Sequence, residues 1–341
     1  MADVESGLDA HLVEHDDEVP RGASPVAVWL VKGKMRALAT AAVVAIVLFA
    51  GATAVIRQPV FSFGRPAERL ASPDRLRRDV VFVIATHASN LNATADFIAR
   101  EFAGAGARVT VQEFVARKQR FRNVIAEYGP AASSEPVLVV GAHYDVFSER
   151  GEFPGADDNA SGTAALLELA RVLHGRQLAR PVMLVAYANE EPPFFGSEQM
   201  GSAVHARWLE ERHRRVAGMV CLEMVGYYSG NQRSESWVLR LMYPRRGDFI
   251  AVAGGWSDRA LARSVKRALG TSMHAVSFTG PRSMLDASDQ RNYWSRGWPA
   301  VMVTDTAYER NPNYHTPRDT AETLDYARMA RVVDGLVTYI Q

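Results

Sequence analysis

The segment "PVLVVGAHYD", residues 136–145, is a short apolar run that ends in a histidine and an aspartate, and it is the strongest indication of the fold class. A continuous apolar run of this length is typical of a strand that is buried on both faces of a sheet. The stretch "PVMLVAYANEE" (181–191) has the same form and also ends in acidic residues. Between the two, "ASGTAALLELARVLHG" (160–175) has the apolar spacing of a helix and ends at a glycine.

The same alternation continues over most of the chain. Further helices are expected over 74–88, 92–106 and 328–340. Further strands are expected over 107–116, 121–129, 216–228, 237–244 and 298–306. This alternation predicts an α/β fold, with three α/β/α layers and a mixed, mostly parallel central sheet.

The composition excludes several classes of function. The 341 residues carry a formal net charge of +1, which gives no electrostatic preference for nucleic acid, so no nucleic-acid partner is expected. The chain has one cysteine, Cys221, and this count excludes intrachain disulfides and zinc sites built from cysteine clusters.

An apolar segment near the N-terminus predicts a membrane span. The stretch "ALATAAVVAIVLFAGATAVI" (37–56) has no charged residue and matches the ~20 residues that a helix needs to cross a bilayer. Residues 1–36 before it are expected to be a disordered cytoplasmic tail, because the acidic N-terminal part has no hydrophobic period. Residues 57–73 are predicted to form a linker, and residues 74–341 the folded domain.

The charges around this segment predict its orientation. Lys32, Lys34 and Arg36 precede it and only Arg57 follows at once, so the positive-inside rule places the N-terminus in the cytoplasm and the domain outside. A cleaved secretory signal is the alternative. The long leader and the long apolar core favour an uncleaved, single-pass anchor instead.

Unusual acidic and histidine residues follow the buried strands. His143 and Asp145 end one strand, and Glu190 and Glu191 follow the next. Glu223 and His315 come after two later strands. In an open α/β sheet, ligands bind at the carboxyl ends of the strands, so these side chains are expected to meet in one acidic patch.

The loop "GADDNASG" (155–162) adds two neighbouring aspartates to this patch. Several buried acids would cost many kcal/mol unless a cation compensates them. Carboxylates and imidazoles without cysteine suit zinc and tolerate cobalt or manganese, and one aspartate can bridge two metals. Taken alone, the loop is more simply a helix start whose acids offset the helix dipole. The joint occurrence at successive strand ends favours metal binding.

Six ordered blocks of the chain resemble the co-catalytic dizinc aminopeptidase family. They are "GAHYD", "PGADDNASGTAALLELAR", "YANEE", "GSEQM", "LEMVGY" and "YHTPRDT", and the resemblance covers roughly residues 75–341. The family includes bacterial leucyl aminopeptidases, the peptidase domains of glutamate carboxypeptidases and, more distantly, glutaminyl cyclases. The resemblance implies a fold of the zinc exopeptidase type, two Zn²⁺ ions per chain and a peptide substrate.

The resemblance also implies a role for each site residue. His143, Asp158 and Glu223 are expected to hold one zinc, and Asp158, Glu191 and His315 the other. Glu190 matches the general base that activates a metal-bridging hydroxide. Asp145 matches the acid that orients His143. Tyr314 matches a tyrosine that binds the oxyanion in some members.

Two departures from the family pattern concern these residues. Glu223 stands where several members have aspartate, and Gln290 stands where some aminopeptidases have histidine.

The resemblance leaves alternative functions open. A membrane-anchored aminopeptidase is the first expectation, since all five ligand positions and the base are filled. A carboxypeptidase would need an arginine for the substrate carboxylate, although Arg282, Arg291, Arg310 and Arg318 are most simply solvated. A glutaminyl cyclase binds a single zinc and generally lacks the acid pair. A non-catalytic receptor-like homologue would have lost ligands.

Overall fold

A computed structural model describes residues 25–60, 66–130, 134–147, 153–234 and 237–341. Most of the predicted disordered tail, residues 1–24, lies outside the described residues. The chain divides into two compact units, residues 1–52 and residues 53–341.

The described part of the first unit is most of helix α1 (Pro25–Arg57). The part from Lys34 to Arg57 is long and apolar enough to cross a membrane, and it carries the apolar segment identified in the sequence. A signal sequence near the N-terminus has the same length and composition. The chain therefore has one candidate helix for a membrane anchor or a signal sequence among the described residues.

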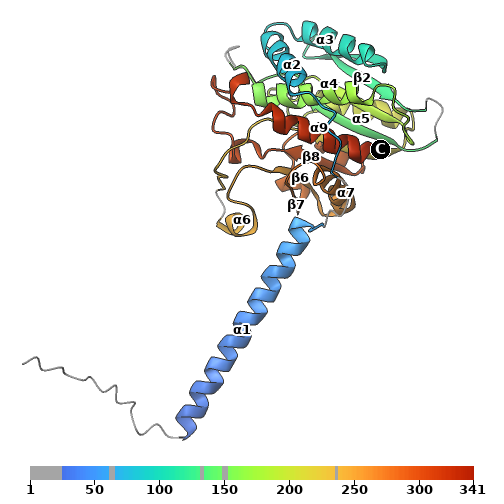
Figure 1. Cartoon of the computed structure of the whole chain (residues 1–341). Coiled ribbons are helices and arrows are strands. Elements are labelled where there is room, and N and C mark those ends of the chain that lie inside the picture. The colour runs from blue at the N-terminus through green and yellow to red at the C-terminus, as the bar shows by residue number, and fades with distance from the viewer. Residues whose placement is uncertain (1–24, 61–65, 131–133, 148–152, 235–236) are drawn as a thin grey trace, which may run out of the picture. The chain divides into compact units, whose positions relative to one another are not determined.

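The second unit is built around one eight-stranded sheet, in the order β1-β2-β4-β3-β5-β8-β6-β7 (Figure 1). Four of the seven neighbouring pairs are parallel, and the other three are antiparallel. This confirms the predicted mixed, mostly parallel sheet. The strands are β1 (Arg108–Ala116), β2 (Gln119–Tyr128), β3 (Val137–His143), β4 (Val182–Tyr187), β5 (Val216–Leu222), β6 (Ile250–Gly255), β7 (Ala275–Gly280) and β8 (Ala300–Thr304).

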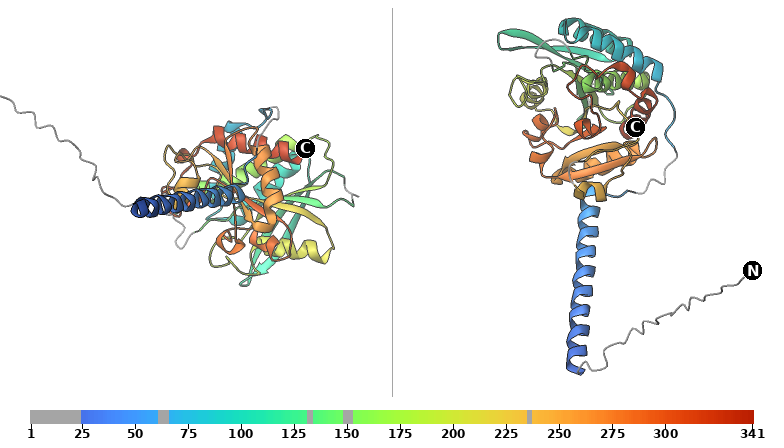
Figure 2. Two further views of the ribbon diagram at one scale, coloured as in Figure 1. Left: turned by 90° about the horizontal axis from the view of Figure 1, so that it is seen from below. Right: turned by 90° about the vertical axis from the view of Figure 1, so that its left-hand side faces the viewer.

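Helices cover both faces of the sheet, which confirms the three-layer architecture. One face packs against the helices α3 (Leu91–Gly104), α4 (Gly162–Leu173), α7 (Arg259–Leu269) and α9 (Tyr326–Ile340). The other face packs against α5 (Gly201–Glu211) and the short α8 (Arg291–Trp294). Helix α2 (Pro73–Thr86) packs on α4 and α9. Figure 2 shows the β1–β2 hairpin with α2 and α3 at one end of this unit, and β6 and β7 at the other.

Strand β3 lies in the centre of the sheet, as its apolar sequence predicts. All seven of its residues are buried, with β4 on one side and β5 on the other. Gly141 gives the ring of Tyr187 room to lie against β3, because a Cβ there would come within 2.3 Å of that ring. The strand order places β3, β4, β5 and β8 side by side and parallel, so their carboxyl ends share one edge of the sheet.

Two parts of the sequence interpretation need correction. Residues 237–244 were expected to form a strand, but Trp237–Met242 form helix α6. Short apolar runs are ambiguous between helix and strand, and tertiary packing decides between the two. Strands β6 and β7 were not predicted, because their alanine, glycine and serine residues give a weak strand signal.

Candidate metal centre

The predicted ligands meet at the shared carboxyl edge of the parallel strands. His143 is the last residue of β3, Glu191 follows β4 by four residues, and Glu223 follows β5 at once. Asp158 lies in the irregular turn that precedes α4, and His315 lies in the segment after β8. Four of the five side chains are buried, and about a quarter of the His315 side chain is exposed.

These side chains form two triads that share one aspartate. In the first triad, His143 Nε2 lies 3.4 Å from Asp158 Oδ1 and 3.4 Å from Glu223 Oε2. In the second, His315 Nε2 lies 2.9 Å from Asp158 Oδ2 and 3.5 Å from Glu191 Oε1. The potential ligand atoms of each triad lie within 4.8 Å of one another. The two oxygens of Asp158 thus face different histidines.

Asp145 and Glu190 lie directly beside the first triad. The Nδ1 edge of His143 faces Asp145, at 3.2 Å from its carbonyl oxygen and 3.5 Å from Oδ1, which leaves Nε2 to face the acids. The carboxylate of Asp145 also accepts hydrogen bonds from the backbone N–H groups of Glu190 and Glu191, both at 3.1 Å. Glu190 Oε2 lies 3.9 Å from His143 Nε2. Asp145 therefore fixes both the imidazole and the backbone that carries the two glutamates.

Asn159 ties the loop of Asp158 to the residues that flank Glu223. Its Nδ2 donates to the carbonyl of Leu222 at 2.8 Å, and its Oδ1 accepts from the N–H of Met224 at 3.1 Å. The same Oδ1 accepts from the N–H of Gly162 at the start of α4. One amide side chain thereby sets the distance between two ligands of the first triad.

The carboxylates of Asp157 and Asp319 also hold the loop of Asp158 in place. Asp319 accepts hydrogen bonds from the backbone N–H groups of Asp157 and Asp158, at 3.0–3.2 Å. Asp157 does not point at either histidine; its carboxylate accepts from the N–H of Gly226 at 2.9 Å and from Asn311 Nδ2 at 2.8 Å. The two acids of "GADDNASG" thus differ in role: Asp158 belongs to the triads, whereas Asp157 forms hydrogen bonds with the surrounding chain.

The ionisable side chains of the two triads strongly shift one another's pKa values. Burial alone would raise the pKa of Asp158, but the nearby His143 and His315 lower this pKa to about 2. Burial and the charge of Asp158 raise the pKa of Glu191 to about 7. Burial, with Glu191 and Glu223, raises the pKa of Glu190 well above its ordinary value. The site holds more negative groups than two imidazoles compensate, which favours a cation there.

Orphaned buried atoms show that the residues fit divalent metal ions. The Nε2 atoms of His143 and His315, and Oε1 of Glu191, are buried without a hydrogen-bond partner among the described residues. Native proteins rarely leave such atoms unsatisfied. All three belong to the triads, and imidazole nitrogens and carboxylate oxygens are ligands that zinc accepts.

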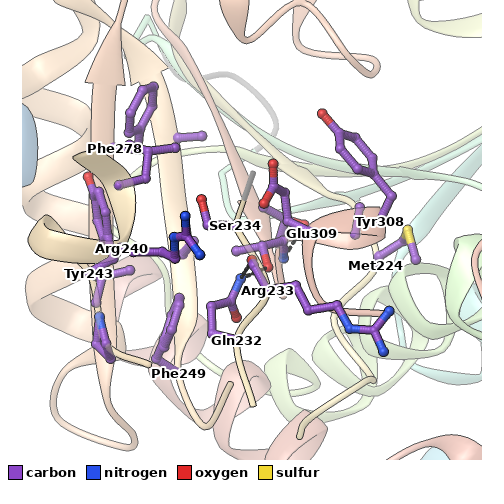
Figure 3. Close-up of a pocket in the computed structure, with 18 of the residues that line it drawn as sticks. Met224, Gln232, Arg233, Ser234, Arg240, Tyr243, Phe249, Phe278, Tyr308 and Glu309 are labelled. Atoms are coloured by element: carbon purple, nitrogen blue, oxygen red, sulfur yellow. Dashed lines mark hydrogen bonds between the residues drawn. The ribbon is translucent and has the colours of Figure 1, made fainter. Parts of the chain in front are cut away.

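A large cavity opens beside the first triad. Its volume is about 990 Å³, and both Glu223 and Tyr314 line it. Figure 3 shows Phe278, Tyr243 and Phe249 on one side of the cavity, and Met224, Tyr308 and Glu309 on the other. The ring of Tyr314 stacks on His315, with centroids 3.8 Å apart. Tyr314 therefore contacts His315 and also lines the cavity.

The sequence interpretation missed several residues around the site. Ser288 donates to Glu223 Oε2 at 2.6 Å, and Asp289 next to it is fully buried. Arg310 was expected to be solvated, but it is only 1% exposed and its guanidinium packs on Phe249 at 4.4 Å. The motif block "YHTPRDT" contained Asp319, but nothing in the sequence indicated that its carboxylate holds another loop.

Comparison with known sequences gives the family of the chain. The pattern of Peptidase family M28 matches residues 123–340. The Escherichia coli (strain K12) protein described as "Uncharacterized protein YfbL" is 45% identical over 291 residues, covering 80% of this chain and 88% of that protein. Leucine aminopeptidase 1 of Trichophyton rubrum is 28% identical over 242 residues, covering 65% and 60% of the two chains.

Solved structures agree with the fold. LapB from Legionella pneumophila superposes with a TM-score of 0.64 at 20% identity, over 84% of this chain and 78% of that chain. The glutaminyl cyclase of Porphyromonas gingivalis superposes with a TM-score of 0.62 at 19% identity, over 80% and 99%. At such identities these likenesses support the architecture alone. The match over residues 123–340 shows that the chain belongs to Peptidase family M28.

Proposed function

We propose that this protein is a membrane-anchored, zinc-dependent aminopeptidase that removes N-terminal residues from peptides. The observation that carries the proposal is the pair of triads that share Asp158. Relatives described as leucine aminopeptidases and as probable zinc metalloproteases support the same activity. Three residues, His143, Asp158 and Glu223, would hold one zinc, and Asp158, Glu191 and His315 would hold a second.

A pair of bound zinc ions supplies Lewis-acid chemistry, polarising the peptide carbonyl and lowering the pKa of water. The chain supplies the proton transfer. Glu190 is buried beside the triads and belongs to neither, so its carboxylate is free to accept a proton from the attacking water and to pass it to the leaving amine. Asp145 keeps His143 in one orientation and fixes the backbone N–H of Glu190.

Tyr314 is proposed to bind the oxyanion that forms at the carbonyl. Its ring is held in place by stacking on His315 and faces the cavity beside Glu223. Because burial raises the pKa of its phenol, Tyr314 keeps its proton and can donate it as a hydrogen bond.

The cavity is proposed to receive the side chain of the N-terminal residue. Phe249, Phe278 and Met302 contribute apolar surface to it, and about 990 Å³ accommodates a bulky side chain. Substrates with a bulky apolar N-terminal residue are therefore expected to be preferred over those with a small or acidic one.

Metal analysis of the purified full chain tests the ligand assignment. Wild-type protein is expected to hold two zinc ions per chain, and Asp158→Asn to lose both, since the same carboxylate serves both triads. Retention of two ions by Asp158→Asn would contradict the assignment.

A substrate panel tests the direction of cleavage. Peptides with a free amine are expected to lose their first residue, while the same peptides with a blocked N-terminus are expected to stay intact. Release of the C-terminal residue, or cyclisation of an N-terminal glutamine, would assign the site to a carboxypeptidase or a glutaminyl cyclase instead.

The anchor and its orientation are proposed from the span Lys34–Arg57 and the charges before it. An impermeant thiol reagent applied to intact cells is expected to label Val115→Cys, which is 67% exposed in the folded domain, and to spare Lys34→Cys. The reverse pattern would place the catalytic domain in the cytoplasm.

A further inference from the structure

The end of helix α1 is fastened to the peptidase domain by side chains. Helix ends leave carbonyl groups without intrahelical partners. Ser277 and Thr279, both buried on one face of β7, donate their hydroxyls to the carbonyls of residues 55–57 at 2.6–3.1 Å. The ammonium of Lys266 in α7 donates to the carbonyls of residues 57 and 58 at 2.7 and 3.0 Å. All these residues belong to the unit 53–341.

These hydrogen bonds hold residues 55–58 directly against the sheet, with no flexible linker between them. If α1 spans the membrane, as proposed above, its last turn lies at the membrane surface, and β7 lies there with it. β7 is an edge strand, and β1 is the opposite edge of the same sheet. The contacts therefore determine which edge of the domain is close to lipid.

A group of exposed side chains lies near this edge, and we call it the α6 surface. It consists of Trp237, Arg240 and Leu241 of α6, with Met284 from the turn after β7. The exposed fractions are 67% for Trp237, 61% for Leu241 and 69% for Met284. Trp237 and Leu241 are four residues apart and so share one face of the helix. All three apolar side chains line the same cavity, so they form one patch, and contiguous exposed apolar patches mark interaction sites.

Tyr243 connects the α6 surface to the end of the span. It follows α6 directly, its hydroxyl donates to the carbonyl of Ser277 at 2.7 Å, and its ring lies 5.6 Å from the guanidinium of Arg57. A helix rises 1.5 Å per residue, so Trp237 lies within about 9 Å of Tyr243 along α6. Interfacial helices bury their apolar face by ~5–10 Å at the lipid boundary. The distance from Tyr243 to Trp237 is of similar size, so Trp237 is close enough to the end of the span to reach this layer.

We infer that the α6 surface sits in the lipid headgroup layer of the membrane that α1 crosses. Tryptophan is enriched at this interface, and leucine and methionine can reach the acyl boundary. Residues 231–246 contain four arginines and one glutamate, and guanidinium groups bind lipid phosphates well. Three apolar side chains offer little surface for a stable protein dimer, which buries about 800 Å² on each partner.

This placement has a consequence for the substrate. Trp237, Arg240, Leu241 and Met284 also line the cavity beside the metal centre. The mouth of the cavity then opens at the membrane surface. The peptides that reach it most readily are those held at the lipid surface themselves.

Spin labelling of the full chain in nanodiscs of phosphatidylcholine and phosphatidylglycerol tests the inference. A nitroxide at Trp237→Cys is compared with one at Val115→Cys, which has the same exposed fraction of 67% but lies on β1 at the opposite edge. A third label at Ile46→Cys reports on the span. The native Cys221 is fully buried and does not react with the label. The relative access of oxygen and of a water-soluble nickel chelate gives the depth of each label.

We expect the Trp237→Cys label to exclude the nickel chelate several-fold better than the Val115→Cys label, and the Ile46→Cys label to lie in hydrocarbon. Equal nickel access at positions 237 and 115, with residue 46 in hydrocarbon, would overturn the inference and leave the anchor intact. Residue 46 in water would overturn both. Dipolar broadening between labels at position 237 would assign the surface to a second copy and also overturn it. Peptide hydrolysis by the wild-type chain in the same nanodiscs tests the proposed activity separately.

Discussion

At the scale of single residues, two neighbouring glutamates have separate environments. Glu191 faces His315 and belongs to the second triad, while Glu190 faces His143 and belongs to neither. Their backbone N–H groups are held by the two oxygens of one carboxylate, that of Asp145. Adjacent residues of the same type can therefore take different roles, because the turn after β4 directs them to different partners.

The two glutamates are predicted to respond differently to the same substitution. Glu190→Gln is expected to keep both zinc ions and to lose at least about 10²-fold in kcat, as loss of a general base does. Glu191→Gln is expected to lose one zinc ion, because a ligand is removed. Metal content and kcat measured on the same preparations check both. Near-normal turnover by Glu190→Gln would contradict its role as the base.

Asp145 is predicted to act on metal affinity through His143. Asp145→Asn keeps the size of the side chain but removes the negative charge that faces Nδ1. Loss of such a partner typically costs 10–100-fold in metal affinity or activity. Competition with a zinc chelator measures the affinity. An unchanged zinc affinity would show that the carbonyl of Asp145 alone orients the imidazole.

At the scale of elements, the packing between α4 and β5 positions the metal ligands. The start of α4 approaches β5 so closely that a Cβ on Gly162 would lie 2.4 Å from Asn159 Oδ1 and 2.7 Å from the carbonyl of Leu222. Asn159 is the side chain that joins the loop of Asp158 to the end of β5. The glycine after "GADDNAS" is thus required by packing between elements.

Gly162→Ala is predicted to destabilise the domain and to weaken zinc binding. Overpacking of this kind costs about 1–3 kcal/mol of unfolding free energy, and displacing Asn159 moves Asp158 relative to Glu223. The control is Gly104→Ala at the end of α3, where nothing lies within 4 Å and stability is expected to stay equal or rise slightly. Denaturant unfolding and zinc titration of both variants check the prediction.

Helix α5 contains a buried histidine that predicts a pH dependence of stability. Burial lowers the pKa of His205 to about 3, and its Nδ1 lies 2.7 Å from the hydroxyl of Tyr293. Because the folded pKa lies below the unfolded value of about 6.5, the unfolded state binds more protons in this range. His205 therefore makes the domain lose about 2 kcal/mol of unfolding free energy as the pH falls from 6.5 to 4.5.

His205→Gln is expected to remove this part of the acid destabilisation, while His274→Gln, at an exposed position, is expected to keep it. Thermal unfolding of the three proteins between pH 4.5 and 7.5 measures the effect. Identical pH profiles for wild type and His205→Gln would show that His205 does not remain neutral in the folded state.

At the scale of the whole molecule, the metal centre joins segments that are far apart in the chain. The two triads draw residues from position 143 to position 315, so ions bound there cross-link most of the domain. A ligand that binds only the folded state stabilises it by about 2.7 kcal/mol per site at a hundredfold excess over Kd. For a domain of this size, each kcal/mol raises Tm by roughly 2–4 °C.

Removal of zinc is therefore predicted to lower Tm by about 10 °C or more when both sites are occupied at such an excess. Asp158→Asn is expected to show the same Tm with zinc and with a chelator, because both triads are incomplete. Thermal unfolding of the full chain in detergent, with and without zinc, measures the difference. A zinc-dependent Tm in Asp158→Asn would show that the ions bind elsewhere.

The class of fold and the family could both be predicted from the sequence, because buried strands are continuous apolar runs and the ligands stand directly after them. It placed His143, Glu190, Glu191 and Glu223 beside strands whose carboxyl ends share one edge. Strand β3 and the motif blocks depend on local patterns, and local patterns are visible in a sequence.

The contacts that hold these strands and ligands in place became visible only in the folded domain. In the folded domain, residues 237–242 form a helix and Arg310 is buried. The side chains of Asp157, Asn159 and Asp319 form hydrogen bonds that hold the loop of Asp158 in place. None of these outcomes could be predicted locally, because each depends on contacts with residues that are distant in the chain. A short apolar run or a lone polar side chain has no preference of its own until those partners pack against it.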